Sequence, residues 1–112
     1  MFEILDTTLR EGEQTPYVNF TVDEKIEIAR LLDEVGVEMI EAGDPSVAPS
    51  IARAVENIAS LGLRAEIVAH SIATRASIDR VKACGADRVA IFSRGRIVEV
   101  LGMVRCRPEF GQ

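Results

Sequence analysis

Several residue types are scarce in this chain of 112 residues, and each shortage narrows its class. It has no tryptophan, one histidine and two cysteines, Cys84 and Cys106. One cysteine pair outside a CxxC spacing is not a disulfide framework, so we expect reduced thiols. No apolar run approaches the ~18 residues that a membrane helix needs. The first ten residues lack the pattern of a signal peptide. We therefore expect no membrane association and a cytoplasmic location.

Positively charged residues are also fewer than negatively charged ones. The chain has 13 Lys and Arg against 18 Asp and Glu, which gives a net charge of −5. Phosphate backbones are bound by clustered Lys and Arg, so this balance argues against nucleic acid as a partner. The hydrophobic content of 47% is spread along the chain, which excludes a disordered protein and predicts one globular domain or a piece of one.

The hydrophobic pattern alternates between strand and helix. Apolar runs predict buried strands over 2–5, 37–42, 63–70 and 86–92, and helical periodicity predicts helices over 21–36, 50–62 and 73–85. Thr21 and Glu24 have the spacing of a capping box, and Gly36 is placed to end the first of these helices. Its apolar face is predicted from these residues: Ile26, Ile28, Ala29, Leu31, Leu32 and Val35. The opposite face, with Lys25, Glu27 and Arg30, is expected to be solvated.

Strands that follow helices after short turns predict a parallel sheet with right-handed crossovers. Two architectures fit this repeat, a (β/α) barrel and a doubly wound sheet. The turn after the first strand has no glycine-rich nucleotide motif, and polar residues gather at the strand ends, where barrels place catalytic groups. We therefore predict an α/β fold that forms part of a (β/α)8 TIM barrel, about three βα units plus a fourth strand.

The stretch "DTTLREGEQTP" is the densest group of candidate functional residues. A carboxylate such as Glu11 can ligate a hard divalent cation, and the neighbouring Arg10 can stabilise an oxyanion. Glu13 and Gln14 complete this group. The alternative is a solvated loop with local ion pairs. Elsewhere, Asp44 is interpreted as a loop carboxylate and Cys84 as a packing residue.

This motif, with "FTVDEKIEIARLLDEVGVEMIEAG" behind it, resembles the start of the homocitrate, isopropylmalate and citramalate synthase group over about residues 2–92. These enzymes, related to hydroxymethylglutaryl-CoA lyase, are acetyl-CoA-dependent condensing enzymes built on (β/α)8 barrels. The resemblance implies acetyl-CoA as co-substrate, a 2-oxo acid as partner, and a divalent metal (Mg²⁺, Mn²⁺ or Zn²⁺). It favours 2-oxoglutarate, hence homocitrate. Isopropylmalate or citramalate synthesis is the alternative.

The resemblance also implies residue roles. Arg10 matches the arginine that contacts the 2-oxo acid and steadies the developing alkoxide, and Glu11 matches the metal-binding carboxylate. Gln14 matches a glutamine beside the active site. Glu41 matches an acidic residue near the substrate, although an ion pair with Arg10 is an equal alternative. His70 resembles the histidine near the distal carboxylate of 2-oxoglutarate, with a structural hydrogen-bonding role as the alternative.

The resemblance weakens after residue 92. We interpret 1–92 as the N-terminal part of a TIM-barrel catalytic domain and 93–112 as an atypical, arginine-containing tail, such as a shifted reading frame would produce. The family completes its metal site with an HxH pair, which a chain with His70 as its one histidine lacks. We therefore expect the 112-residue chain alone to be inactive. Exposed strand edges predict a homo-oligomer, and a non-catalytic, self-associating half-barrel is the competing hypothesis.

Overall fold

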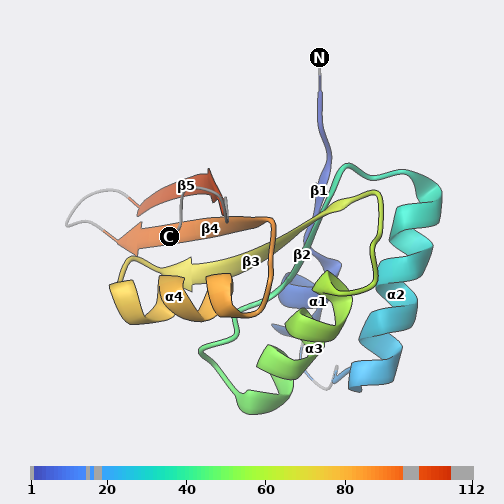
Figure 1. Cartoon of the computed structure of the whole chain (residues 1–112), viewed down its shortest axis with the longest axis horizontal. Helices are drawn as coiled ribbons and strands as arrows, with labels where there is room; N and C mark the ends of the chain where they lie inside the picture. Colours follow the sequence, from blue (N-terminus) through green and yellow to red (C-terminus); the bar gives the residue numbers. More distant parts are fainter. Residues whose placement is uncertain (1, 15, 17–18, 95–98, 107–112) are drawn as a thin grey trace.

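A computed structural model describes residues 2–14, 16, 19–94 and 99–106, with the backbone alone at 14, 93, 94 and 99–105. The chain alternates between strands and helices as the sequence predicts (Figure 1). The elements in order are β1 (Leu5–Asp6), α1 (Thr8–Glu11), η1 (Gly12–Gln14), α2 (Val22–Val35), β2 (Met39–Gly43), α3 (Pro49–Ala59), β3 (Glu66–Ile72), α4 (Arg75–Ala83), β4 (Arg88–Arg94) and β5 (Glu99–Arg105).

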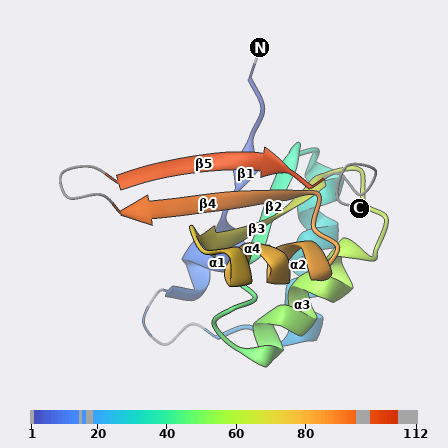
Figure 2. The same ribbon diagram turned by 60° about the vertical axis from the view of Figure 1, so that its left-hand side comes forward.

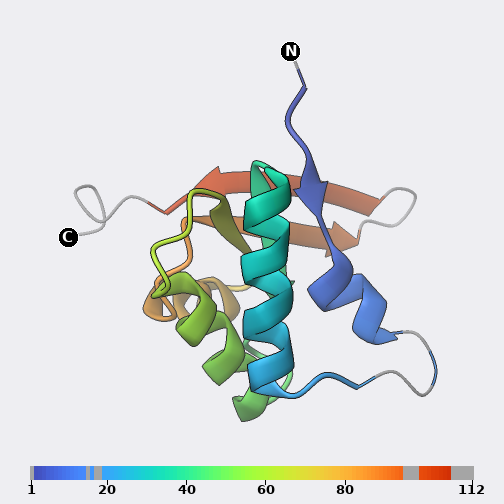
Figure 3. The same ribbon diagram turned by 90° about the vertical axis from the view of Figure 1, so that its right-hand side faces the viewer.

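The strands form one sheet in the order β1-β2-β3-β4-β5, and the first four are parallel. Each parallel strand thus lies beside the next one in the sequence. A doubly wound sheet reverses its strand order, whereas a barrel adds strands consecutively. Helices α2, α3 and α4 lie on one side of the sheet (Figure 2), with α2 and α3 side by side (Figure 3). The predicted α/β class is confirmed, and the arrangement is that of a partial TIM barrel.

The two faces of the sheet carry different side chains, because successive residues of a strand point to opposite faces. The helix-facing side chains, among them Ile40, Ile67 and Val89, form the main core with residues of α2, α3 and α4. The alternate positions Met39, Val68 and Ala90 form a smaller cluster on the other face, with Leu5 packed against it. In a closed barrel this second face points inward.

The first helix of the βα repeat begins and ends as the sequence predicts. The Thr21 hydroxyl accepts from the Glu24 N–H at 3.1 Å, and the Glu24 carboxylate accepts from the Thr21 N–H at 2.8 Å. Gly36 ends α2 with φ of 100°, a left-handed conformation that glycine adopts without steric penalty. This stop lets the chain turn into β2 within three residues.

Two predictions for the N-terminal segment are wrong. The strand expected at 2–5 is the short β1 instead, and Phe2 is 94% exposed. The reason is that β1 is the end strand of the described sheet, so its leading residues have neighbours on one side alone. The stretch expected as a loop, Thr8–Gln14, instead folds into α1 and η1. The Asp6 carboxylate supports this start by accepting from the Thr8 N–H at 2.9 Å.

The faces of α2 also differ from the prediction. Leu31 and Val35 are 53% and 80% exposed, because the core contacts run along Ile26, Ala29 and Leu32. Lys25, expected on the solvated face, is buried. No strand was predicted within 93–112, where β5 pairs antiparallel with β4 from Arg88↔Arg105 to Arg94↔Glu99 (Figure 2). Residues 95–98 and 107–112 of that predicted tail lie outside the described residues.

Candidate functional site

The candidate residues meet at the carboxyl ends of neighbouring parallel strands. Arg10 lies on α1, directly after β1, while Glu41 lies near the end of β2 and His70 near the end of β3. Glu41 pairs in register with Val68, two residues before His70. Positions 41 and 70 share the face of Met39 and Val68, since strand residues alternate. The sheet therefore gathers these residues at the edge where parallel α/β enzymes hold their active sites.

Arg10 is held between two carboxylates. Its Nε donates to Glu41 Oε1 at 2.5 Å, and its Nη1 lies 3.0 Å from Glu11 Oε1. The Glu41 side chain is 3% exposed and the Arg10 side chain 22%. The ion pair that the sequence offered as one reading of Glu41 is therefore present. A partly buried charge pair fixes the guanidinium plane and leaves its other N–H groups available to a ligand.

His70 lies on the other side of Glu41. Its Nδ1 is 3.7 Å from Glu41 Oε2, and it is buried with no hydrogen-bond partner among the described residues. The ring lies 6.1 Å from that of Phe92 on β4, tilted by 35°. Glu41 thus has one carboxylate oxygen towards each candidate residue, Arg10 and His70.

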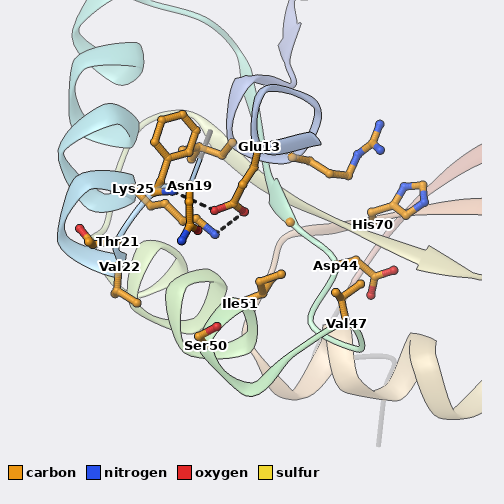
Figure 4. Close-up of a pocket in the computed structure, with 14 residues that line it drawn as sticks. Glu13, Asn19, Thr21, Val22, Lys25, Asp44, Val47, Ser50, Ile51 and His70 are labelled. Atoms are coloured by element: carbon orange, nitrogen blue, oxygen red, sulfur yellow. Dashed lines mark hydrogen bonds and ion pairs between the residues drawn. The ribbon is translucent and has the colours of Figure 1, made fainter. Parts of the chain in front are cut away.

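A cavity of about 720 Å³ opens beside these residues. Its walls come from α1 and η1, the start of α2, the turn after β2 and the start of α3 (Figure 4). Arg10 and His70 line it, together with apolar side chains on several sides such as Leu9, Phe20 and Ile51. Its volume falls in the range of small-molecule sites, and so does its mixture of apolar walls and a few charged groups.

The wall opposite His70 contains a buried ion pair that the sequence did not reveal. Glu13 Oε1 lies 2.8 Å from Lys25 Nζ, and Glu13 Oε2 accepts from the Phe20 N–H at 3.1 Å (Figure 4). This arrangement corrects the solvated assignment of Lys25. Its signal was the spacing, because Lys25 is one helical turn before the buried Ala29. Glu13, predicted to belong to one group of candidate residues with Arg10 and Glu11, pairs with Lys25 and joins η1 to α2.

The remaining predicted site residues lie in different surroundings. The Glu11 side chain is 55% exposed and contacts Arg10. Gln14 is in η1, and its side chain lies outside the described residues. Asp44 lines the cavity and accepts from the Ser46 N–H at 2.9 Å, which fits the loop role expected of it.

Gly43 shapes the cavity where β2 turns towards α3. Its φ is +145°, and the pairing of β2 with β3 shifts register between Glu41 and Gly43. A Cβ at this position would lie 2.9 Å from Ile51 Cγ2, closer than carbon atoms approach without displacement. The absence of a side chain therefore lets α3 begin next to the strand end.

The metal that the resemblance implies would need several protein ligands placed around one point. The described part of the chain contains no group of three His, Cys, Asp or Glu side chains placed to hold a metal ion. Glu11 is an accessible carboxylate, while Glu41 is engaged by Arg10 and Glu13 by Lys25. A divalent cation needs several oxygen or nitrogen ligands, so these residues do not by themselves fit a complete metal site.

The cysteines lie in the core, away from the cavity. Both are free thiols: Cys84 is buried at the C-terminal end of α4, and Cys106 packs against the same core. Burial raises the pKa of each thiol, helped by Glu56 near Cys84 and opposed by Lys82 near Cys106. Thiols with raised pKa are poor nucleophiles, which fits the packing role expected of Cys84. In the described residues we also find no helix long and apolar enough to cross a membrane.

The consecutive parallel strands, with charged residues gathered at their carboxyl ends, define a segment of an α/β barrel. The model of the family described as HMGL-like matches residues 1–105. The match runs through β5, beyond the residues that carried the sequence motifs. The chain belongs to this family.

Curated relatives are similar to a large part of the chain. A homocitrate synthase of Sulfolobus acidocaldarius is 50% identical over 93 residues, which cover 80% of this chain and 20% of that protein. A homocitrate synthase of Pyrococcus abyssi is 52% identical over 89 residues, covering 80% of this chain and 25% of the relative. A homocitrate synthase of Saccharolobus solfataricus is 50% identical over 93 residues. The matched part thus spans a fifth to a quarter of these relatives' length.

Proposed function

We propose that this chain carries the 2-oxo acid-binding part of a homocitrate synthase-type active site. The reaction is an acetyl-CoA-dependent condensation that extends 2-oxoglutarate to homocitrate. The observation that carries the proposal is the convergence of Arg10, Glu41 and His70 beside the cavity, within a segment about 50% identical to homocitrate synthases. The cationic side chain of Arg10, fixed at the end of a barrel, suits an anionic substrate.

Arg10 has the main chemical role in this proposal. In the condensation, a base takes a proton from the methyl group of the thioester, the enolate carbon formed in this way attacks the keto carbon, and the keto oxygen takes up negative charge. Donors already held in place stabilise such charge without reorganising during the reaction. Arg10 meets this requirement, because Glu41 holds its Nε and Glu11 its Nη1. The new alkoxide then takes a proton, and hydrolysis of the thioester releases CoA.

The choice of 2-oxoglutarate rests on His70. A dicarboxylate needs a second polar partner beyond the one that holds its 2-oxo acid end, and His70 lines the same cavity as Arg10. 2-Oxoisovalerate, the substrate of the isopropylmalate alternative, ends in an apolar group instead. Such a ligand would offer the His70 imidazole no hydrogen-bond partner.

The metal and the co-substrate belong to the proposal as well. Glu11 would supply one ligand to a Mg²⁺, Mn²⁺ or Zn²⁺ ion, with the other ligands from outside the described residues. Such an ion would polarise the keto oxygen. Acetyl-CoA would approach over the cavity rim. We expect the chain alone to bind the 2-oxo acid weakly and to show no turnover, because the residues that the structure describes do not fit a complete metal site.

The direct test is ligand binding followed by turnover. The chain is titrated with 2-oxoglutarate and, separately, with 2-oxoisovalerate, with Mg²⁺ or Mn²⁺ present, and binding is measured by calorimetry. We expect 2-oxoglutarate to bind more tightly, and Arg10→Met to lose that binding, while the exposed Arg30→Met on α2 retains it. Acetyl-CoA consumption is followed in parallel. Equal binding of both acids would contradict the substrate choice, and no binding of either would contradict the function.

A non-catalytic, self-associating role is the second candidate. It is favoured by the exposure of Phe2 and Ile4 beside β1, the end strand of the described sheet. Apolar residues beside an end strand are a template for pairing with another chain. We therefore propose a homo-oligomer. Light scattering at several concentrations tests it, with Phe2→Ser as the variant, and a monodisperse monomer throughout would contradict self-association.

A further inference from the structure

The relation of Glu41 to His70 carries an inference beyond ligand binding. Glu41 is almost completely buried in β2, and its Oε1 accepts from Arg10 Nε. Its Oε2 faces Nδ1 of His70 at 3.7 Å. A water molecule does not fit between these atoms, since two hydrogen bonds of about 2.8 Å span a longer gap. A buried carboxylate oxygen and a buried ring nitrogen therefore face one another directly.

The ring nitrogens of His70 have different surroundings. Nδ1 is buried without a hydrogen-bond partner among the described residues, whereas the residue itself lines the cavity. Leaving a buried polar atom unpaired is unfavourable, and Glu41 Oε2, 3.7 Å away, is an acceptor that faces it. An ionised carboxylate accepts only, so a pairing between the two requires the proton on Nδ1. Nε2 is then the nitrogen that remains for the cavity.

We propose that Glu41 is a positioning residue that fixes His70 as the Nδ1–H tautomer and links it to Arg10. Through its two oxygens, Glu41 would set the direction of both ligand-facing groups at once. Carboxylates that face a histidine elsewhere orient the ring in this way and determine which nitrogen carries the proton. The proposal rests on the proposed function for the identity of the ligand alone, because the tautomer is a property of the free chain.

His70 is the only histidine in the sequence, which makes the test direct. The chain is labelled with ¹⁵N-histidine, and two-bond ¹H–¹⁵N correlation spectra are recorded at a pH where the imidazole is neutral. In the wild type we expect Nδ1 to resonate as a protonated, pyrrole-type nitrogen and Nε2 as a pyridine-type one. In Glu41→Gln the tautomer ratio should shift roughly tenfold or more towards Nε2–H, because the charge-assisted acceptor is gone and the amide can donate to Nδ1.

Glu66→Gln is the matched control. Glu66 lies on β3 four residues before His70, on the same face, and pairs with Arg88 at 2.7 Å. Removing its charge should leave the tautomer of His70 unchanged. Methyl signals report whether Glu41→Gln is folded. If it is not, the tautomer of His70 in the wild-type spectrum alone tests the proposal. A wild-type ring in the Nε2–H form, or a folded Glu41→Gln with an unchanged ratio, would overturn the proposal.

A second arm separates this proposal from the proposed function. 2-Oxoglutarate is added to the labelled wild type, and the His70 signals are followed. A shift of the Nε2 signal with Nδ1–H retained supports both. If the tautomer is Nδ1–H and 2-oxoglutarate leaves every His70 signal in place, the binding role fails while the positioning role of Glu41 stands.

Discussion

Glu13 Oε1 and Lys25 Nζ form an ion pair of 2.8 Å in the cavity wall, with the side chains 19% and 4% exposed. The pair connects η1 to α2, so it fixes the short helices that carry Arg10 and Glu11 against the first long helix. Glu13 also accepts from the Phe20 N–H, which satisfies its second oxygen. Both oxygens of Glu13 are thus engaged, and each member of the pair depends on the other for compensation of its charge.

Lys25→Met should destabilise the fold by about 3 kcal/mol, because breaking a buried pair leaves one charge without compensation. The methionine keeps the apolar stem of the side chain, so the loss reports charge rather than volume. Chemical denaturation measures it, and Arg30→Met, on the exposed face of the same helix, should change the free energy of unfolding by less than about 0.5 kcal/mol. The double variant Glu13→Gln, Lys25→Met should be more stable than Lys25→Met. A mild effect of Lys25→Met would mean that the pair is solvated.

The parts of the fold that were predicted correctly are those that depend on residues close together in the sequence. Thr21, Glu24 and Gly36 form a cap and a stop by contacts within a few residues, so their roles follow from spacing. The strand order likewise follows from the regular alternation of strand and helix. Exposure of Phe2 and the pairing of Lys25 with Glu13 depend on contacts between separate segments, and the spacing of Lys25 from Ala29 indicates its face but not its partner.

Gly43→Ala should destabilise the chain by roughly 2–3 kcal/mol. The alanine would have to keep a positive φ, and its Cβ would lie 2.9 Å from Ile51 Cγ2. Gly36→Ala is the matched control: its φ is +100°, but a Cβ there has open space, so only the backbone strain of roughly 1 kcal/mol applies. Thermal unfolding compares the two. The stability that Gly43→Ala loses beyond Gly36→Ala should be smaller in a chain that also carries Ile51→Ala. Equal losses of stability in the two variants would show that Ile51 does not clash with a side chain at position 43.

Glu11→Ala should leave the free energy of unfolding within about 0.5 kcal/mol of the wild type, because Glu11 is more than half exposed and its pair with Arg10 is superficial. The same substitution should abolish any dependence of 2-oxoglutarate binding on Mg²⁺ or Mn²⁺. Denaturation and calorimetry measure the two effects on one sample. Glu27→Ala, exposed on α2, is the control for charge alone. Metal-dependent binding that survives in Glu11→Ala would remove Glu11 from the proposed metal site.

The residues of the candidate site could be predicted from the sequence, but the contacts between their side chains could not. The motif placed Arg10 and Glu11 after a strand, and the parallel sheet implied that Glu41 and His70 meet them at the same edge. The sequence left open whether Glu41 faces a substrate or Arg10, because the two readings differ by a side-chain direction. The structure shows the ion pair with Arg10, and it adds the contact between Glu41 and His70.

The free energy of unfolding should fall as the pH rises above about 9, the ordinary pKa of a thiol. Burial raises the pKa of Cys84 and Cys106, so the folded chain keeps thiol protons that the unfolded chain releases. Deprotonation therefore favours the unfolded state, and the stability present at neutral pH is lost through this window. Denaturation between pH 7 and 10.5 measures the slope, and the Cys84→Ala, Cys106→Ala variant corrects for the other groups that titrate there. The wild type should lose more stability over this range than the variant, and parallel curves would show that both thiols are solvated.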